Sequence, residues 1–168
     1  IKGDLCGLGA AGNPQGKVAE RIAGMPFLNY APKAYPVTLW DIHGQSGHPL
    51  RTTLSEMGPL LLGSLLELTD SQQSTLYAAF KVADREGLLL LDLKDLKALL
   101  NHLKFHPELL GEDAALMTTG SSQALLRRLA VLDQQGAEAL FGEPALQLED
   151  ILQPASDGRG RIHLLDAS

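Results

Sequence analysis

Glycines near the start of the sequence have the spacing of a phosphate-binding loop. Gly7, Gly9 and Gly12 satisfy the pattern G-x-G-x-x-G. In dinucleotide sites such glycines lead into a helix whose amides bind pyrophosphate, and an acid about twenty residues on binds the ribose. Here Asp41 lies 29 residues after Gly12, and Pro14 removes one of the early helix amides. The glycine spacing makes an NAD-type dinucleotide site, formed by these glycines and Asp41, one hypothesis. The long separation and Pro14 count against it.

A second stretch, residues 11–18, nearly matches the nucleoside-triphosphate loop G-x-x-x-x-G-K-[ST]. Ala11 stands where the first glycine belongs, and Val18 replaces the hydroxyl residue that would hold Mg²⁺. Without that hydroxyl the metal loses a ligand. The sequence therefore excludes a functional loop of this type in residues 11–18.

Other ionisable residues lack the partners that catalysis would need. Asp92 follows the leucine run 88–91, as an Mg²⁺-binding Asp can follow a strand, but it equally suits a helix N-cap. His102 and His106 can share one helical face, yet two imidazoles are an incomplete metal site. Cys6 has no identifiable base. These residues form no complete catalytic set.

The first third of the chain is predicted to hold loops, one short helix and a small β element. A helix is expected at about 15–23, and the prolines after it prevent a longer one. Residues 37–42 are the best strand candidate. Turn residues at 44–47 lead to a second extended piece at about 48–53, and this arrangement predicts a β-hairpin.

From residue 55 onward, leucine spacing and capping residues predict a series of helices. Pro59 suits a first helical turn, Thr69 with Gln72 forms a capping box, and Asp92 suits an N-cap. Ser121 or Ser122 is expected to open a further helix. The predicted helices are 59–68, 69–86, 92–106, 121–135 and 146–152, with a final strand at 161–165.

Composition supports a mainly helical fold. The 168 residues include 35 leucines but nine valines and isoleucines together. Unbranched side chains keep more rotamer freedom in a helix. We therefore predict a mainly α protein with a small β part (α+β), a leucine-rich helical bundle flanked by short strands. The single Cys6 suits a reducing cytoplasm, and no apolar run is long enough to cross a membrane.

Charge and composition divide the chain into three predicted parts: 1–54, 55–153 and 154–168. Residues 1–55 carry five basic and three acidic side chains, whereas residues 56–168 carry nine basic and seventeen acidic ones. Binding to nucleic acid needs concentrated positive charge. The acidic helical part is therefore a poor candidate for a DNA surface. The first residue is Ile1, and we expect the chain to be a piece of a longer protein.

Several longer strings occur in a characteristic order. They are KGDL at 2–5, VTLWD at 37–41, HPLRTTLSEMGP at 48–59, LLLLDLKDL at 88–96, GEPA at 142–145 and GRG at 158–160. Together they resemble the bacterial HerA-like helicase C-terminal family, P-loop ATPases related to HerA and to FtsK-type DNA pumps. The resemblance extends over essentially the whole chain, and the string at 48–59 is its most specific part.

The resemblance implies a fragment from the middle of an incomplete RecA-like ATPase domain. The family's phosphate loop would precede Ile1, and the acidic strand that serves Mg²⁺ and water would follow Ser168. ATP and Mg²⁺ would then belong to the parent protein, and this chain alone would bind no cofactor and would not hydrolyse ATP. The parent would be an ATP-driven motor and a homo-oligomer, for example a hexameric ring. DNA would be a candidate substrate.

For individual residues the resemblance implies two roles. Lys2, Gly3 and Asp4 would lie at the periphery of the nucleotide site, and Arg51 would contact a phosphate, for example across a subunit boundary. The helical section would be an addition to the ATPase core. A stand-alone helical protein-interaction module remains a further alternative.

Overall fold

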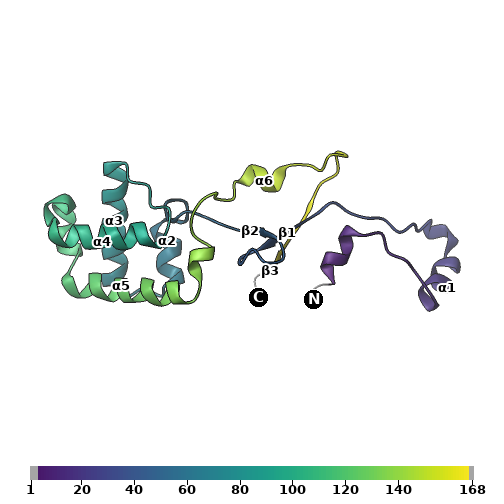
Figure 1. Ribbon diagram of the computed structural model, residues 1–168, viewed down its shortest axis with the longest axis horizontal. Coiled ribbons are helices and arrows are strands. Elements are labelled where there is room, and N and C mark those ends of the chain that lie inside the picture. The colour runs from purple at the N-terminus through teal and green to yellow at the C-terminus, as the bar shows by residue number, and fades with distance from the viewer. Residues whose placement is uncertain (1–3, 167–168) are drawn as a thin grey trace. The chain divides into compact units, whose positions relative to one another are not determined.

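A computed structural model describes residues 4–166, which divide into two compact units (Figure 1). We call residues 50–146 the helical unit and the remainder, residues 1–49 and 147–168, the sheet unit. The helical unit contains α2 (Leu54–Leu65), α3 (Asp70–Glu86), α4 (Leu93–Phe105), the 3-10 helix η3 (Pro107–Leu116), α5 (Thr119–Gln134) and η4 (Ala137–Ala139). The sheet unit contains η1 (Leu5–Gly9), α1 (Lys17–Ala23), η2 (Pro26–Leu28), β1 (Val37–Asp41), β2 (His48–Pro49), α6 (Leu148–Leu152) and β3 (Ile162–Asp166).

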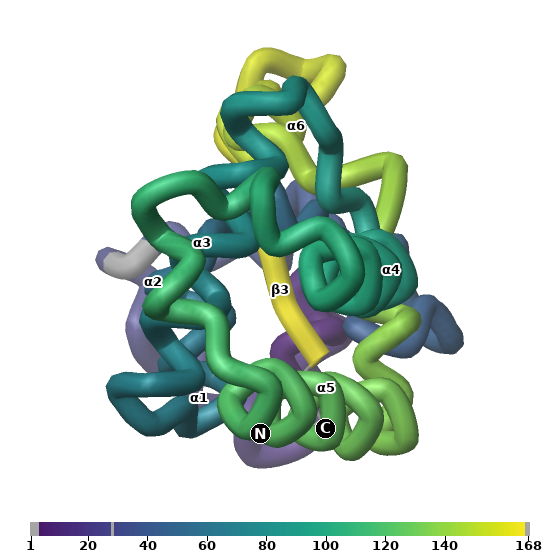
Figure 2. Tube along the Cα trace, turned by 90° about the vertical axis from the view of Figure 1, so that its left-hand side faces the viewer, coloured from purple at the N-terminus to yellow at the C-terminus, as the bar shows by residue number. Residues whose placement is uncertain are grey.

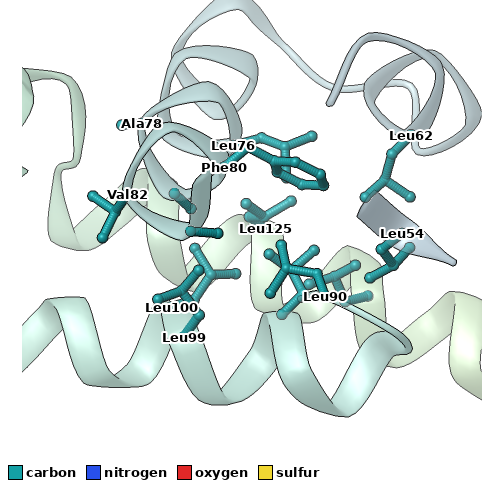
Figure 3. Close-up of a cluster of buried hydrophobic side chains, with 14 of the residues drawn as sticks. Leu54, Leu62, Leu76, Ala78, Phe80, Val82, Leu90, Leu99, Leu100 and Leu125 are labelled. Atoms are coloured by element: carbon teal, nitrogen blue, oxygen red, sulfur yellow. The ribbon is translucent and has the colours of Figure 1, made fainter. Parts of the chain in front are cut away.

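The helical unit is built around buried leucines. Leucines from α2, α3, α4 and α5 meet in one cluster together with Phe80 and Val82 (Figure 3). The fully buried leucines are Leu54, Leu62, Leu76, Leu93, Leu96, Leu100, Leu103, Leu125 and Leu129. Burying a side chain of this size contributes about 1.5–3 kcal/mol of transfer free energy. The leucine excess seen in the sequence therefore supplies this core.

Local capping signals set several helix boundaries. In α3 the Gln72 side chain accepts a hydrogen bond from the Thr69 amide at 3.1 Å, and Gly87 ends the helix with φ 66°. Asp92 caps α4 by accepting from the amides of Lys94 and Asp95. These boundaries confirm the sequence-based expectations, because each depends on residues within one turn.

Two helices begin earlier than predicted. α2 starts at Leu54, capped by Thr53, whose hydroxyl accepts from the Glu56 amide at 3.1 Å. Gly58, with φ 70°, then kinks the chain before Pro59. α5 is capped by Thr118, and Ser121 and Ser122 lie buried in its first turn. In both cases a threonine upstream of the predicted start supplies the cap.

Polar contacts join the helices around the core. The Thr75 hydroxyl of α3 lies 2.7 Å from the Ser121 hydroxyl of α5, and both side chains are buried. Lys97 of α4 forms a half-buried ion pair with Asp133 of α5, with Nζ and Oδ2 2.5 Å apart. Figure 2 shows α5 in the same group of helices as α3 and α4, which it contacts. The buried hydroxyls are thus satisfied across the α3–α5 contact.

The sheet unit contains a three-stranded parallel sheet with the order β2-β1-β3. β1 and β3 pair along their full length, from Val37 opposite Ile162 to Asp41 opposite Asp166. β2 is only two residues long and pairs with Trp40 and Asp41.

The predicted hairpin of residues 37–42 and 48–53 is wrong, because β1 and β2 run parallel. The Asp41 carboxylate binds the amides of the following loop and coils it, so that the chain resumes beside β1 in the same direction. Gly47 makes this approach possible. A Cβ at Gly47 would lie 2.7 Å from the Leu39 carbonyl oxygen.

The two faces of the sheet are only partly covered. Strand pairing places Val37, Leu39, Ile162 and Leu164 on one face, and Trp40, His163 and Leu165 on the other. Among the side chains that the structure describes in this unit, only Asp41 is buried. The sheet unit therefore lacks an apolar core of its own within the described residues.

The structure confirms the predicted fold class, a mainly helical protein with a small β part. Within residues 4–166, strands lie only toward the two ends, as expected. Across residues 4–166, no helix has the length and apolar character needed to cross a membrane.

The leucine core gives a first prediction. Leu125→Ala should lower the free energy of unfolding of the helical unit by about 2–5 kcal/mol, because it removes a fully buried side chain from α5 and leaves a cavity. Urea unfolding followed by circular dichroism at 222 nm measures the change. Leu89→Ala, at a leucine that is 72% exposed, should change the free energy by less than about 0.5 kcal/mol. Equal effects of the two substitutions would contradict this account of the core.

Candidate functional site

The carboxyl edge of the parallel sheet is the candidate functional site. β1 ends at Asp41 and β3 ends at Asp166, and the two residues are paired in register. Because both strands run in the same direction, their carboxyl ends lie at one edge, with the 42–47 loop beside them. Ligands of open parallel sheets bind outside this edge.

Asp41 anchors the loop at this edge. Its Oδ1 accepts from the His43 amide at 2.8 Å, and its Oδ2 accepts from the amides of Gln45 and Ser46, each at 2.7 Å. These hydrogen bonds, from Ser46 first and then His43, hold the pKa of Asp41 below its ordinary value. The carboxylate is therefore ionised and occupied by backbone amides, which suits a structural role better than a general base.

A cluster of one indole and two imidazoles lies beside this edge. Trp40 Nε1 donates to His163 Nδ1 at 2.9 Å, and the two rings stack with centroids 5.9 Å apart. The His48 ring is also close to Trp40, with the two ring centroids 5.9 Å apart. The other ring nitrogen of His163, Nε2, is buried without a hydrogen-bond partner. Strand pairing creates this cluster across 123 residues of sequence, so no local signal predicted it.

The glycines proposed for a dinucleotide site do not form one in the described residues. Gly7 and Gly9 lie in the 3-10 helix η1, and α1 begins only at Lys17, five residues after Gly12. Asp41, the proposed ribose ligand, is engaged with its own loop. The strand–turn–helix geometry that presents amides to pyrophosphate is absent from residues 4–23.

The same stretch does not fit a triphosphate and Mg²⁺. The near-match at 11–18 is an exposed loop leading into α1, and it has no strand before it within the described residues. Val18 is an exposed apolar side chain at the position of the metal-binding hydroxyl. Residues 11–18 therefore provide no cradle for Mg²⁺-ATP.

The other predicted site residues have separate positions. Lys2 and Gly3 lie outside the described residues, and Asp4 is exposed immediately before η1. Arg51 is half-buried between β2 and α2, where its Nη1 donates to the Glu143 carbonyl at 2.9 Å. The Arg51 carbonyl in turn accepts from the Leu146 amide at 2.8 Å. Arg51 thus ties the first residues of the helical unit to its last ones, and its Nε is buried without a partner.

The remaining chemical candidates are also placed. His102 and His106 are adjacent, with ring centroids 4.4 Å apart, and His106 Nδ1 lies 2.9 Å from Glu108. Within the part of the chain that the structure describes, no three His, Cys, Asp or Glu side chains are grouped to hold a metal ion. Cys6 is exposed in η1. None of these groups forms a second candidate site.

A comparison with protein families gives one match. The family model described as Helicase HerA-like C-terminal matches residues 1–168, the whole chain. The chain belongs to this family, which confirms the resemblance seen in the sequence. No curated protein and no solved structure matches it.

The anchoring role of Asp41 gives a second prediction. Since its folded pKa is depressed, its stabilising effect should be complete above the ordinary pKa of Asp, about 4, and should be lost as pH falls through the folded value. Asp41→Asn should therefore unfold the sheet at lower urea than the unsubstituted chain at pH 7, and this difference should vanish in acid. Fluorescence of Trp40, the single tryptophan, reports the transition. The control is Asp4→Asn, at an exposed acid whose side chain caps nothing, and it should behave as the unsubstituted chain does. An unchanged midpoint for Asp41→Asn at pH 7 would contradict the assigned role.

Proposed function

We propose that this member of the HerA-like helicase C-terminal family contributes the middle part of the ATPase domain of an ATP-driven motor in the cytoplasm. In this proposal the strands of the sheet unit are part of the central sheet of the ATPase domain, and the helical unit is a module added to that domain. Family membership over the whole chain carries the proposal. The parallel sheet, whose two faces are only partly covered, supports it.

The sheet supports this assignment because all-parallel sheets occur almost only with both faces covered. Here both faces carry apolar or aromatic side chains, Val37 and Leu39 on one and Trp40 and Leu165 on the other, and none of them is buried. A sheet with two apolar faces is typical of the central layer of an α/β domain. Further elements of the parent protein would cover these faces.

The position of the nucleotide follows from the strand direction. In this proposal Mg²⁺-ATP is held by residues of the parent outside the chain, and it faces the carboxyl edge marked by Asp41 and Asp166. Lys2, Gly3 and Asp4 are proposed at its periphery. Arg51 is proposed as a phosphate contact, with the fork of its guanidinium shared between the phosphate and the Glu143 carbonyl.

We further propose that the parent is a homo-oligomer that acts on DNA. The helical unit carries thirteen acidic and eight basic side chains. This charge disfavours binding of the DNA backbone, so DNA would meet other surfaces of the motor.

This proposal gives a third prediction. The purified 168-residue chain should hydrolyse no ATP above the buffer rate. The encoding gene should specify G-x-x-x-x-G-K-[ST] before Ile1 and an acidic strand after Ser168, and its full product should hydrolyse ATP faster with duplex DNA. Phosphate release measured on both proteins, with and without DNA, tests each part. ATP turnover by the isolated chain would contradict the proposal that residues of the parent outside this chain carry out catalysis. A gene without the phosphate loop would contradict the proposal that the parent is an ATP-driven motor.

A further inference from the structure

α1 and the residues after it, up to residue 33, bury none of their described side chains. α1 has seven residues, none of them buried. An isolated helix of this length is not stable in water, so it needs a surface to pack on. The apolar side chains it and its neighbours expose are Val18, Met25, Phe27 and Tyr30, and Phe27 is 81% exposed.

The same segment is basic. Residues 17–33, which we call the basic arm, contain Lys17, Arg21 and Lys33 but one acid, Glu20. The arm therefore combines exposed apolar side chains with a net charge of +2, three basic minus one acidic residue. A surface that binds the basic arm should therefore be apolar, with acidic residues nearby.

α2 of the helical unit presents such a surface. Leu62 and Leu66 point into the core, whereas Leu60, Leu61 and Leu65 lie on the outer side of the helix. Leu60 and Leu61 are 64% and 62% exposed. We call Leu60, Leu61 and Leu65 the leucine face. An exposed apolar patch of neighbouring leucines is typical of an interaction site.

The sequence on either side of the leucine face is acidic. Residues 52–80, which contain α2 and the first part of α3, carry Glu56, Glu67 and Asp70 and not one Lys, Arg or His. Charges of one sign around an apolar patch favour a partner of the opposite sign. The basic arm has that sign, and it has the apolar side chains to cover the leucines.

We propose that the basic arm of one copy of this chain docks on the leucine face of a second copy. The interface is head-to-tail, because each copy contributes a different surface to each contact. Phe27 and neighbouring apolar side chains cover the leucines, while Lys17 and Arg21 meet the acidic residues of the 52–80 segment. This inference goes beyond the proposed function, since it concerns the 168 residues alone and requires neither ATP nor DNA.

Sedimentation velocity of the complete 168-residue chain over a range of concentrations tests the proposal. The mass should rise above that of one chain, and added salt should weaken the association by screening the charges. Phe27→Asp places a negative charge in the apolar part of the basic arm, and Leu61→Asp places one in the leucine face. Each should weaken self-association at least about tenfold. Phe105→Asp, at a 74% exposed phenylalanine of α4 outside both surfaces, is the matched control and should leave association unchanged.

A mixing experiment separates this interface from any other. The Phe27→Asp chain keeps an intact leucine face, and the Leu61→Asp chain keeps an intact basic arm. The two variants should each be monomeric alone and should form a 1:1 complex when mixed. Circular dichroism should show that both remain folded, because both substitutions are at exposed positions.

Three results would overturn the proposal: a mass of one chain at every concentration, no complex between the two variants, or an equal loss with Phe105→Asp. If Leu61→Asp proves unfolded, the chain with Lys17→Glu and Arg21→Glu takes its place as an association test. It should associate more weakly than the unsubstituted chain at low salt. Unchanged association of that double variant would also overturn the proposal.

Discussion

The two units differ in whether they bury their own apolar side chains, and the rest of the structure follows from this difference. The helical unit buries its own, since leucines from four helices fill one core. The sheet unit does not, since its strands carry apolar residues on both faces and bury none of them among the described side chains. The helical unit is therefore a bundle with its own core, whereas the sheet unit needs other elements to pack on its two faces.

Backbone hydrogen bonds to one carboxylate stabilise the sheet unit locally, since its described residues form no apolar core. Asp41 binds three amides of the loop that follows β1, and the loop then places β2 beside β1. Trp40 and His163 add a hydrogen bond between β1 and β3. These polar contacts fix strand register at the carboxyl edge, the edge where our proposal places the nucleotide.

Sequence reasoning succeeded where the determining interactions are local. The capping box at Thr69 and the N-cap at Asp92 act within one helical turn, so residue spacing was sufficient to predict them. It failed for β2, because the direction of that strand depends on a side chain folding back onto its own loop. It could not find the Trp40–His163 pair, which only the parallel pairing of distant strands brings together. The role of Arg51 as a tie between the ends of the helical unit depends on contacts 92 and 95 residues away.

Hydrogen exchange of individual amides in the isolated 168-residue chain tests the central claim most directly. If the helical unit alone has its own core, amides of α3, α4 and α5 should exchange only through global unfolding, and those of β1 and β3 should exchange at least about 100-fold faster. Equal protection of the strands and the helices would contradict the claim that the sheet depends on cover from elsewhere.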